Sequence, residues 1–293
     1  MIIYAIPTNM ILLKVLILSV IQGAAELLPV SSSAHVIVAE KLMGLDPTRP
    51  EMTLLLVMLH TGTMFAVIFY FWNSWKESFF SSRKVFIDAA VLIISATVIT
   101  GIIGLTIKAL IEKTLLKGAQ HAEIENLFGN LGIMAAALFA AGIFTVWAGR
   151  GNRSRWRGSE LGMREASLIG AVQGLCLPFR GFSRSGATIS MGLALGSSKK
   201  RVEEFSFALA VVLTPPIILR ELMRLMRAQN AHGAGTVLSL LVPSLAGMVL
   251  SFTSGIVALA WLSRWLERGR WQVFGFYCIV ASIAVFLLYR AGV

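Results

Sequence analysis

The sequence predicts an all-α integral membrane protein with six transmembrane helices and two re-entrant helix pairs in an inverted-topology repeat. Of the 293 residues, 56% are hydrophobic and only 14% are charged, whereas about a quarter of the residues in a soluble domain are charged. Several apolar runs are long enough to cross a bilayer as helices. Two further apolar regions are each interrupted near the middle by a cluster of proline, serine and glycine.

Six apolar runs are predicted to be full spans. Each contains roughly the 20 mainly apolar residues that a helix needs to cross the hydrocarbon core. In chain order they are Met52–Trp72, Val85–Leu110, Leu127–Ala148, Phe205–Leu225, Val237–Leu262 and Val273–Tyr289. We expect residues 1–293 to form a single polytopic membrane domain.

The two interrupted regions, Ile11–Met43 and Ala166–Gly196, resemble each other. The first contains VIQGAAELLPVSSSAHVI and the second AVQGLCLPFRGFSRSGATI, so both carry Gln-Gly, Leu-Pro and a Ser-x-Ser triplet. Each half looks too short to span alone, and non-helical backbone at membrane depth is tolerated only where protein buries it or it lines a wet cavity. We therefore expect two re-entrant pairs, within related repeats at residues 10–148 and 160–293.

The charge distribution predicts the orientation of the chain. The net charge is +11, but the basic residues gather in short loops rather than in one stripe, which argues against nucleic acid as a partner. By the positive-inside rule these loops face the cytoplasm. The first re-entrant pair then enters from outside and the second from the cytoplasm, so that their broken helices meet near the midplane.

The first interruption supplies Gln22, Glu26, Ser31, Ser32, Ser33 and His35. Gln22 and Glu26 are four positions apart, so on a helix they share one face and can share a cation or a water. An ionisable group at this depth costs about 2.5–3.5 kcal/mol on insertion scales, so Glu26 predicts a functional pairing. Two simpler interpretations stay open: Gln22 can serve helix packing alone, and one serine can cap the returning half-helix.

The second interruption supplies Arg180, Ser183, Arg184, Ser185, Gly186 and Thr188. Arg184 stands where the returning half-helix begins. A helix N-terminus, a guanidinium group and several hydroxyls form an anion site suited to phosphate. Alternatively, Arg184 pairs with Glu26 as a structural ion pair between the repeats, and both interpretations can hold for the empty protein.

These two motifs resemble the signatures of a known family. QGAAELLPVSSSAH resembles the Gln/Glu-x-x-x-Glu and Pro-Val-Ser-Ser-x-x-His signature of the undecaprenyl-diphosphate phosphatase family, the bacitracin-resistance type. RGFSRSGATIS resembles its second signature, Pro-Gly-x-Ser-Arg-Ser-Gly-x-Thr. The resemblance extends from about residue 10 to the C-terminus. The chain departs from the family at Ala25 (commonly Thr), Ala34 (commonly Gly) and Arg180, which replaces the proline.

The resemblance implies a function and a location. Members remove the terminal phosphate from C55 isoprenyl diphosphate, which regenerates the monophosphate lipid carrier for peptidoglycan synthesis and confers bacitracin resistance. The enzyme then lies in the bacterial inner membrane among membrane lipids, with its active site open to the periplasm and a divalent metal, Mg²⁺ or Ca²⁺, as cofactor. A homodimer is left open.

The resemblance also implies roles for individual residues, carried over by motif position. The catalytic group comprises Glu26, Ser32, His35 and Arg184, with Ser32 or His35 as nucleophile and Arg184 as the diphosphate clamp. Gln22 and Glu26 are the metal-associated pair. Substrate hydrogen bonds are expected from Ser31, Ser33, Ser183, Ser185, Gly186 and Thr188. Whether Ser32, His35 or an activated water attacks stays open.

Two other classes of function fit part of the pattern. Inverted repeats with broken helices at the midplane are typical of secondary transporters, so a lipid flippase or transporter is the first alternative. The serines and His35 also suggest an intramembrane serine protease, which would need neither Arg184 nor a metal. The phosphatase accounts for the arginine and the glutamate together.

Overall fold

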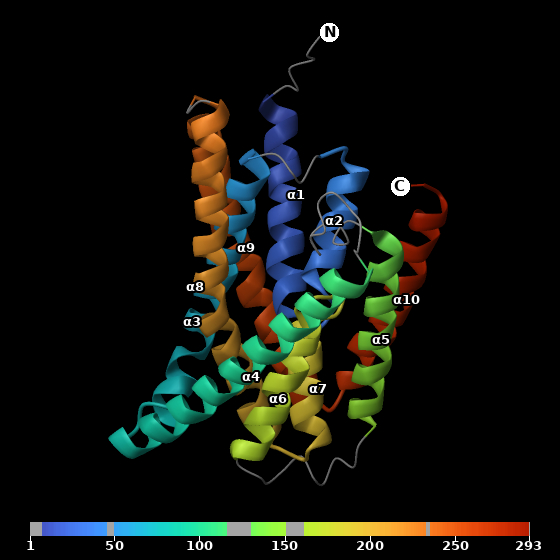
Figure 1. Ribbon diagram of the computed structural model, residues 1–293. Helices are drawn as coiled ribbons and strands as arrows, with labels where there is room; N and C mark the ends of the chain where they lie inside the picture. The colour runs from blue at the N-terminus through green and yellow to red at the C-terminus, as the bar shows by residue number, and fades with distance from the viewer. Residues whose placement is uncertain (1–7, 46–49, 116–129, 151–160, 233–234, 293) are drawn as a thin grey trace.

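The computed structural model describes residues 8–45, 50–115, 130–150, 161–232 and 235–292, and these residues form ten α-helices and no β-strand. The helices are α1 Thr8–Leu27, α2 Ser32–Leu42, α3 Pro50–Ser78, α4 Arg83–Leu115, α5 Leu131–Gly149, α6 Met163–Cys176, α7 Arg184–Ala194, α8 Lys199–His232, α9 Gly235–Glu267 and α10 Trp271–Arg290 (Figure 1). The prediction of an all-α chain is confirmed for the described part.

Six of the helices are long and apolar enough to cross a membrane. The qualifying segments are Leu54–Ser78, Arg83–Thr114, Leu131–Gly149, Lys199–Met223, Val242–Glu267 and Trp271–Arg290. They coincide with the six predicted spans, except that residues 127–129 lie outside the described residues. Most helices extend beyond the apolar run, because backbone hydrogen bonding continues past the first charged residues at each end. The chain is therefore a multi-pass membrane protein.

Both interrupted regions consist of two helices joined by a proline-containing turn. Pro29 follows α1 and Pro178 follows α6, and since proline lacks an N–H group and clashes with the preceding turn, each helix ends before it. None of these four helices is among the segments of the described chain that are long and apolar enough to cross a membrane, although α1 is longer than the other three. That helix has 20 residues, against 11 for α2, 14 for α6 and 11 for α7, because its helical pattern starts at Thr8, upstream of the apolar run.

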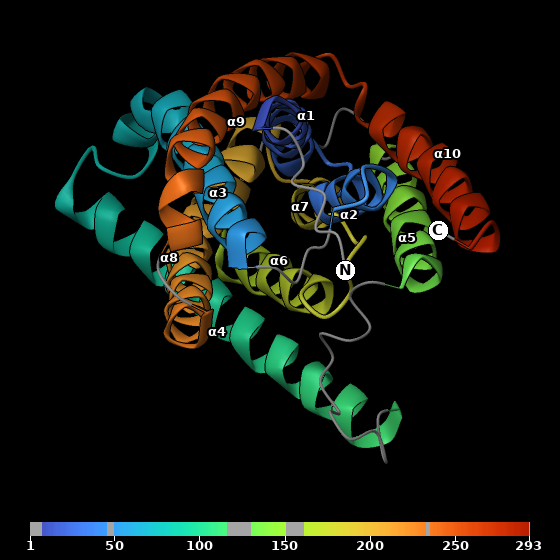
Figure 2. The same ribbon diagram turned by 90° about the horizontal axis from the view of Figure 1, so that it is seen from above.

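Helices α1, α2 and α7 lie at the centre of the molecule (Figure 2). Seen from above, α1, α2 and α7 are surrounded by α3, α9, α10, α5 and α6, while α4 runs along the outside (Figure 2). In the side view α1 and α2 occupy the upper part and α6 and α7 the lower part, and their ends meet between (Figure 1). The two proline-containing turns are thereby brought together inside the helix ring.

The glycine of each Gln-Gly pair allows its helix to lie close to a helix from the other half of the chain. Helix α1 packs on α9, and α6 packs on α4. A Cβ atom at Gly23 would lie 2.4 Å from the backbone oxygen of Ser251, and one at Gly174 would lie 2.9 Å from that of Thr100. Neither contact leaves room for a side chain, so both glycines set how closely α1 and α6 approach their neighbouring helices.

Candidate active site

Glu26 is the centre of a polar network between three helices. It lies in the last turn of α1, and Arg184, the first residue of α7, donates from Nη2 to its Oε1 over 2.9 Å. The hydroxyl of Ser32, the first residue of α2, donates to Oε2 over 2.5 Å. The Glu26 and Arg184 side chains are only 16% and 22% exposed. Glu26 of the first interruption and Arg184 of the second are therefore in direct contact, although they are 158 positions apart in sequence.

Two further side chains approach the same carboxylate. Gln22, one turn earlier on α1, donates from Nε2 to Oε2 of Glu26 over 3.2 Å. His60 on α3 places its Nε2 4.0 Å from this oxygen and 3.4 Å from the Gln22 nitrogen. The other His60 nitrogen, Nδ1, lies 2.9 Å from the backbone oxygen of Leu56 and must donate to it, because a carbonyl only accepts. His60 lies outside both motifs, and the sequence predicts for it only helix packing or a place on the cavity wall; the signal for its position beside Glu26 is an ionisable residue inside an apolar span.

The turn before α2 has an unusual backbone. Ser31 has φ 69°, the only non-glycine residue with positive φ among those that the structure describes. It is the N-cap of α2, but its side chain makes no capping hydrogen bond. Its Oγ lies instead 3.3 Å from Oγ of Ser33, which accepts a hydrogen bond from the N–H of Gly181 over 3.3 Å. The first serine triplet therefore connects the two turns rather than capping a helix with its hydroxyl groups.

The hydroxyl groups of the second serine motif have different roles: one caps α7, and the others bind buried groups of neighbouring segments. Ser183 caps α7 by accepting from the N–H of Gly186 over 3.2 Å. Ser185 donates to the backbone oxygen of Leu28 over 3.2 Å. Thr188 is fully buried, and its hydroxyl lies 2.6 Å from that of Ser206 on α8, so it is not brought to the polar pocket.

Arg180, the departure from the family pattern, lies apart from this network. Its side chain is exposed, and it interacts electrostatically with Glu40 on α2. It therefore connects the second turn with the last part of α2.

The converging side chains enclose a small polar pocket of about 100 Å³. Glu26 and Arg184 line it together with Ser31, Ser32, Ser33, Ser183 and Ser185. One anionic and one cationic group among five hydroxyls can bind a tetrahedral anion and move a proton within the same site.

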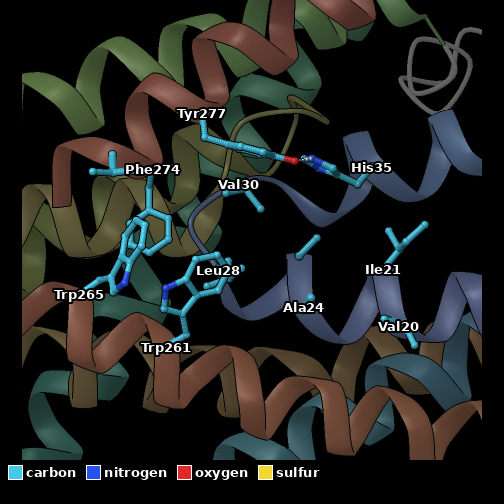
Figure 3. Close-up of a pocket in the computed structure, with 12 residues that line it drawn as sticks. Val20, Ile21, Ala24, Leu28, Val30, His35, Trp261, Trp265, Phe274 and Tyr277 are labelled. Carbon is cyan, nitrogen blue, oxygen red and sulfur yellow. Dashed lines mark hydrogen bonds between the residues drawn. The ribbon is translucent and has the colours of Figure 1, made fainter. Parts of the chain in front are cut away.

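His35 faces a second cavity, which is apolar. This cavity has a volume of about 390 Å³ and lies between α1, α9 and α10, with Trp261, Trp265 and Phe274 among its walls (Figure 3). Nε2 of His35 lies 2.7 Å from the hydroxyl of Tyr277 on α10, and the two rings stack at 5.6 Å. Ala25 lines both this cavity and the polar pocket, so the two are neighbours. Sequence reasoning did not find Tyr277, which looks like an ordinary aromatic residue of the last span.

No ready-made metal cage is present in the described ranges. There, no three His, Cys, Asp or Glu side chains gather in a way that could hold a metal ion. The neighbouring Gln22 amide, Glu26 carboxylate and Ser32 hydroxyl are oxygen-bearing groups, which suit Mg²⁺ or Ca²⁺ when water and a phosphate complete the coordination. The donor set therefore fits a hard divalent cation bound together with a substrate.

Comparison with known proteins identifies the family. A family model described as "Bacitracin resistance protein BacA" matches residues 15–284, which is most of the chain. The chain belongs to the BacA family. Both motifs and both cavities of this BacA-family chain fall within the matched residues.

Curated relatives align with nearly the whole chain. "Undecaprenyl-diphosphatase 2" of Acinetobacter baylyi is 58% identical over 280 residues, which cover 94% of this chain and 98% of the relative. "Undecaprenyl-diphosphatase 1" of Burkholderia pseudomallei is 35% identical, with 91% and 92% covered. "Undecaprenyl-diphosphatase" of Rhodopirellula baltica is 31% identical, with 94% and 98% covered. The BacA-family resemblance thus extends well beyond the two motifs.

Proposed function

We propose that this protein is an undecaprenyl-diphosphatase, which hydrolyses C55 isoprenyl diphosphate to the monophosphate lipid carrier and inorganic phosphate. The observation that carries the proposal is the pairing of a polar pocket that contains Arg184 with a larger apolar cavity next to it. This pairing matches an amphiphile that has a charged phosphate head and an apolar chain. The names of the BacA-family relatives support the same substrate.

Arg184 is proposed to bind the terminal phosphate. Its guanidinium group lies at the N-terminal end of α7, where backbone dipoles also favour an anion. In the empty protein its partner is Glu26. A phosphate competes for the same guanidinium group, so the ion pair and the substrate clamp are successive states of one side chain.

The contact between Ser32 and Glu26 supports Ser32 as the nucleophile. Its hydroxyl already points its proton at the carboxylate, which is the arrangement of a nucleophile and its general base. Attack by Oγ forms a bond to the terminal phosphorus and breaks the bond to the bridging oxygen, so the lipid monophosphate leaves while Glu26 takes the proton. Water then hydrolyses the phosphoserine and releases phosphate. His35 is a weaker candidate, because Nε2 already has a partner.

A divalent metal is proposed as cofactor, held by Gln22 and Glu26. Bound there, Mg²⁺ or Ca²⁺ would stabilise negative charge on the phosphate oxygens. The two side chains share one face of α1, and Gln22 turns its amide nitrogen toward Glu26. A shared cation would therefore need the Gln22 amide to turn its oxygen inward, but no rearrangement of the helix.

We also propose how the chain is arranged in the membrane, beyond the number of its spanning helices. We infer two re-entrant pairs, α1–α2 and α6–α7, in an inverted repeat within the bacterial inner membrane. Support comes from their entry at opposite ends of the molecule and from the α3–α4, α7–α8 and α9–α10 junctions, which lie at one end in Figure 1 and carry basic residues. If that end is cytoplasmic, α1 and α2 enter from the periplasm, to which the site is proposed to open.

The test is phosphate release from detergent-solubilised C55 diphosphate. Wild type is expected to release phosphate with Mg²⁺ or Ca²⁺ and to stop when a chelator is added. Glu26→Gln should lose about a hundredfold or more, because it removes the base, and Arg184→Ala about a thousandfold, because it removes the phosphate clamp. Folded wild type that releases no phosphate with either metal would contradict the proposal and favour a flippase or transporter.

A further inference from the structure

We propose that Tyr277 and His35 form the subsite for the chain-proximal phosphate, the one that stays on the lipid after hydrolysis. This inference rests on the proposed function and extends it. It assigns substrate binding to a residue of α10, outside both sequence motifs.

The position of the pair supports this assignment. Ser32 and His35 are three residues apart at the start of α2 and therefore lie on the same side of the helix. Ser32 lines the polar pocket, whereas His35 lines the apolar cavity. A substrate with its terminal phosphate at Arg184 and its chain in the cavity must place its other phosphate between them, next to His35 and Tyr277.

The chemistry of the cavity wall supports it as well. Apart from His35 and Tyr277, only the indole groups of Trp261 and Trp265 bring polar side-chain atoms to this cavity. The remaining lining side chains are aliphatic or phenyl groups. Polar groups in apolar surroundings need partners, and here the imidazole and the hydroxyl satisfy each other (Figure 3). A phosphate oxygen at this edge of the cavity could accept from the Tyr277 hydroxyl, whereas Nε2 of the neutral imidazole could only accept a hydrogen bond from a protonated phosphate oxygen.

The direction of the hydrogen bond identifies which group can change partner. Nδ1 of His35 lies 2.8 Å from the backbone oxygen of Ser31 and therefore carries a hydrogen. In the neutral ring Nε2 is then an acceptor, so Tyr277 donates to it. The imidazole is held by the backbone oxygen of Ser31, which accepts from Nδ1. The Tyr277 hydroxyl, at the end of a half-exposed side chain, is free to turn to a phosphate oxygen instead.

Tyr277→Phe tests the inference, because it removes the hydroxyl and keeps the ring that lines the cavity. Tyr289→Phe is the matched control: it removes the same atom from an exposed tyrosine of the same helix that lines neither cavity. Inhibition of phosphate release would be measured with isoprenyl monophosphate and, separately, with inorganic phosphate.

We expect Tyr277→Phe to weaken inhibition by the monophosphate lipid about tenfold, the usual effect of losing a hydrogen bond to a charged group. Inhibition by inorganic phosphate should stay unchanged, because that ion binds at Arg184. Unchanged inhibition by the lipid in an active Tyr277→Phe variant would overturn the inference and leave the proposed function standing. An equal loss with both inhibitors would also overturn it, since that result indicates a general distortion. Failure of wild type to release phosphate would instead overturn the proposed function.

Discussion

At the scale of single residues, Ser32 and Ser33 have different hydrogen-bond partners, although they are neighbours in one serine triplet and the sequence alone does not distinguish them. Ser32 donates to the Glu26 carboxylate, whereas Ser33 accepts from the backbone of the second turn. Both are half-buried and line the same pocket. Their surroundings are similar, so a difference in function follows from their partners.

Ser32→Ala is therefore expected to lower the phosphate release rate about a thousandfold or more, because the proposed nucleophile is lost. Ser33→Ala removes only a connection between the turns and should cost less than about tenfold. Steady-state rates for both variants measure the difference. Comparable activity of Ser32→Ala and wild type would exclude a phosphoserine pathway and return attention to His35 or water.

His60 is expected to assist the carboxylate rather than to attack. Because Nδ1 donates to Leu56, Nε2 of the neutral ring is an acceptor 4.0 Å from Glu26 and near Gln22. It can therefore accept the proton that Glu26 takes up, and the protonated ring can then stabilise the carboxylate. His60→Gln should lower kcat about tenfold to a hundredfold with a smaller effect on KM, because the residue does not line the polar pocket. A large rise in KM with unchanged kcat would show that His60 contacts the substrate instead.

At the residue scale the sequence is most informative where residues form compact motifs. Glu26, Ser32 and Arg184 stand out because charges and clustered hydroxyls are costly in an apolar chain. Their contact could be anticipated from two similar interruptions. Tyr277 could not, because its relevance depends on which face of α10 meets α2, and neither hydropathy nor spacing records that.

At the scale of helices, apolar run length predicted all six spanning segments but not their ends. The ends depend on local capping, such as Asn130, which accepts from two backbone N–H groups at the start of α5. The length of α1 was also missed, because its first turns are less apolar than its centre. Hydropathy predicts which part of a helix lies in the membrane, whereas the full length of the helix depends on how far its backbone hydrogen bonds continue.

Glycine contacts between helices provide a test at this scale. Gly23→Ala places a Cβ atom against the backbone of α9, and such overpacking typically costs about 1–3 kcal/mol. Gly101→Ala on α4 is the matched control, because nothing lies within 4 Å of its added Cβ atom, and alanine favours helix by about 0.5–1 kcal/mol. Thermal unfolding in detergent should rank Gly23→Ala below wild type and Gly101→Ala at or above it. The opposite order would mean that the α1–α9 contact is loose.

At the scale of the whole molecule, helices of the first half of the chain pack against helices of the second half. Helix α1 packs on α9, α6 packs on α4, and α5 packs on α10. The similarity of the two interruptions predicted two related halves, and charge predicted their opposite entry. The exchange of outer helices between the halves was not predictable, since it depends on side-chain fit at positions such as Gly23 and Gly174.

The proposed orientation is testable in intact cells by cysteine labelling. Leu42→Cys places an exposed thiol at the end of α2, and Ser82→Cys places one in the α3–α4 turn at the other end of the molecule. The native Cys176 and Cys278 are buried. A membrane-impermeant thiol reagent added outside should label Leu42→Cys, and it should label Ser82→Cys only after the cells are permeabilised. The reverse result would invert the proposed topology.

The ion pair between Glu26 and Arg184 has a consequence for how the protein is made. Ribosomes synthesise the chain from its N-terminus, and the two residues are 158 positions apart. At 5–20 residues per second, Glu26 exists for roughly 8–30 s before its arginine has been synthesised. During that interval the Glu26 carboxyl group lacks its arginine partner and has only the partners supplied by the first half of the chain. The proposed catalytic centre is thus completed late in biogenesis, when synthesis of the second half supplies Arg184.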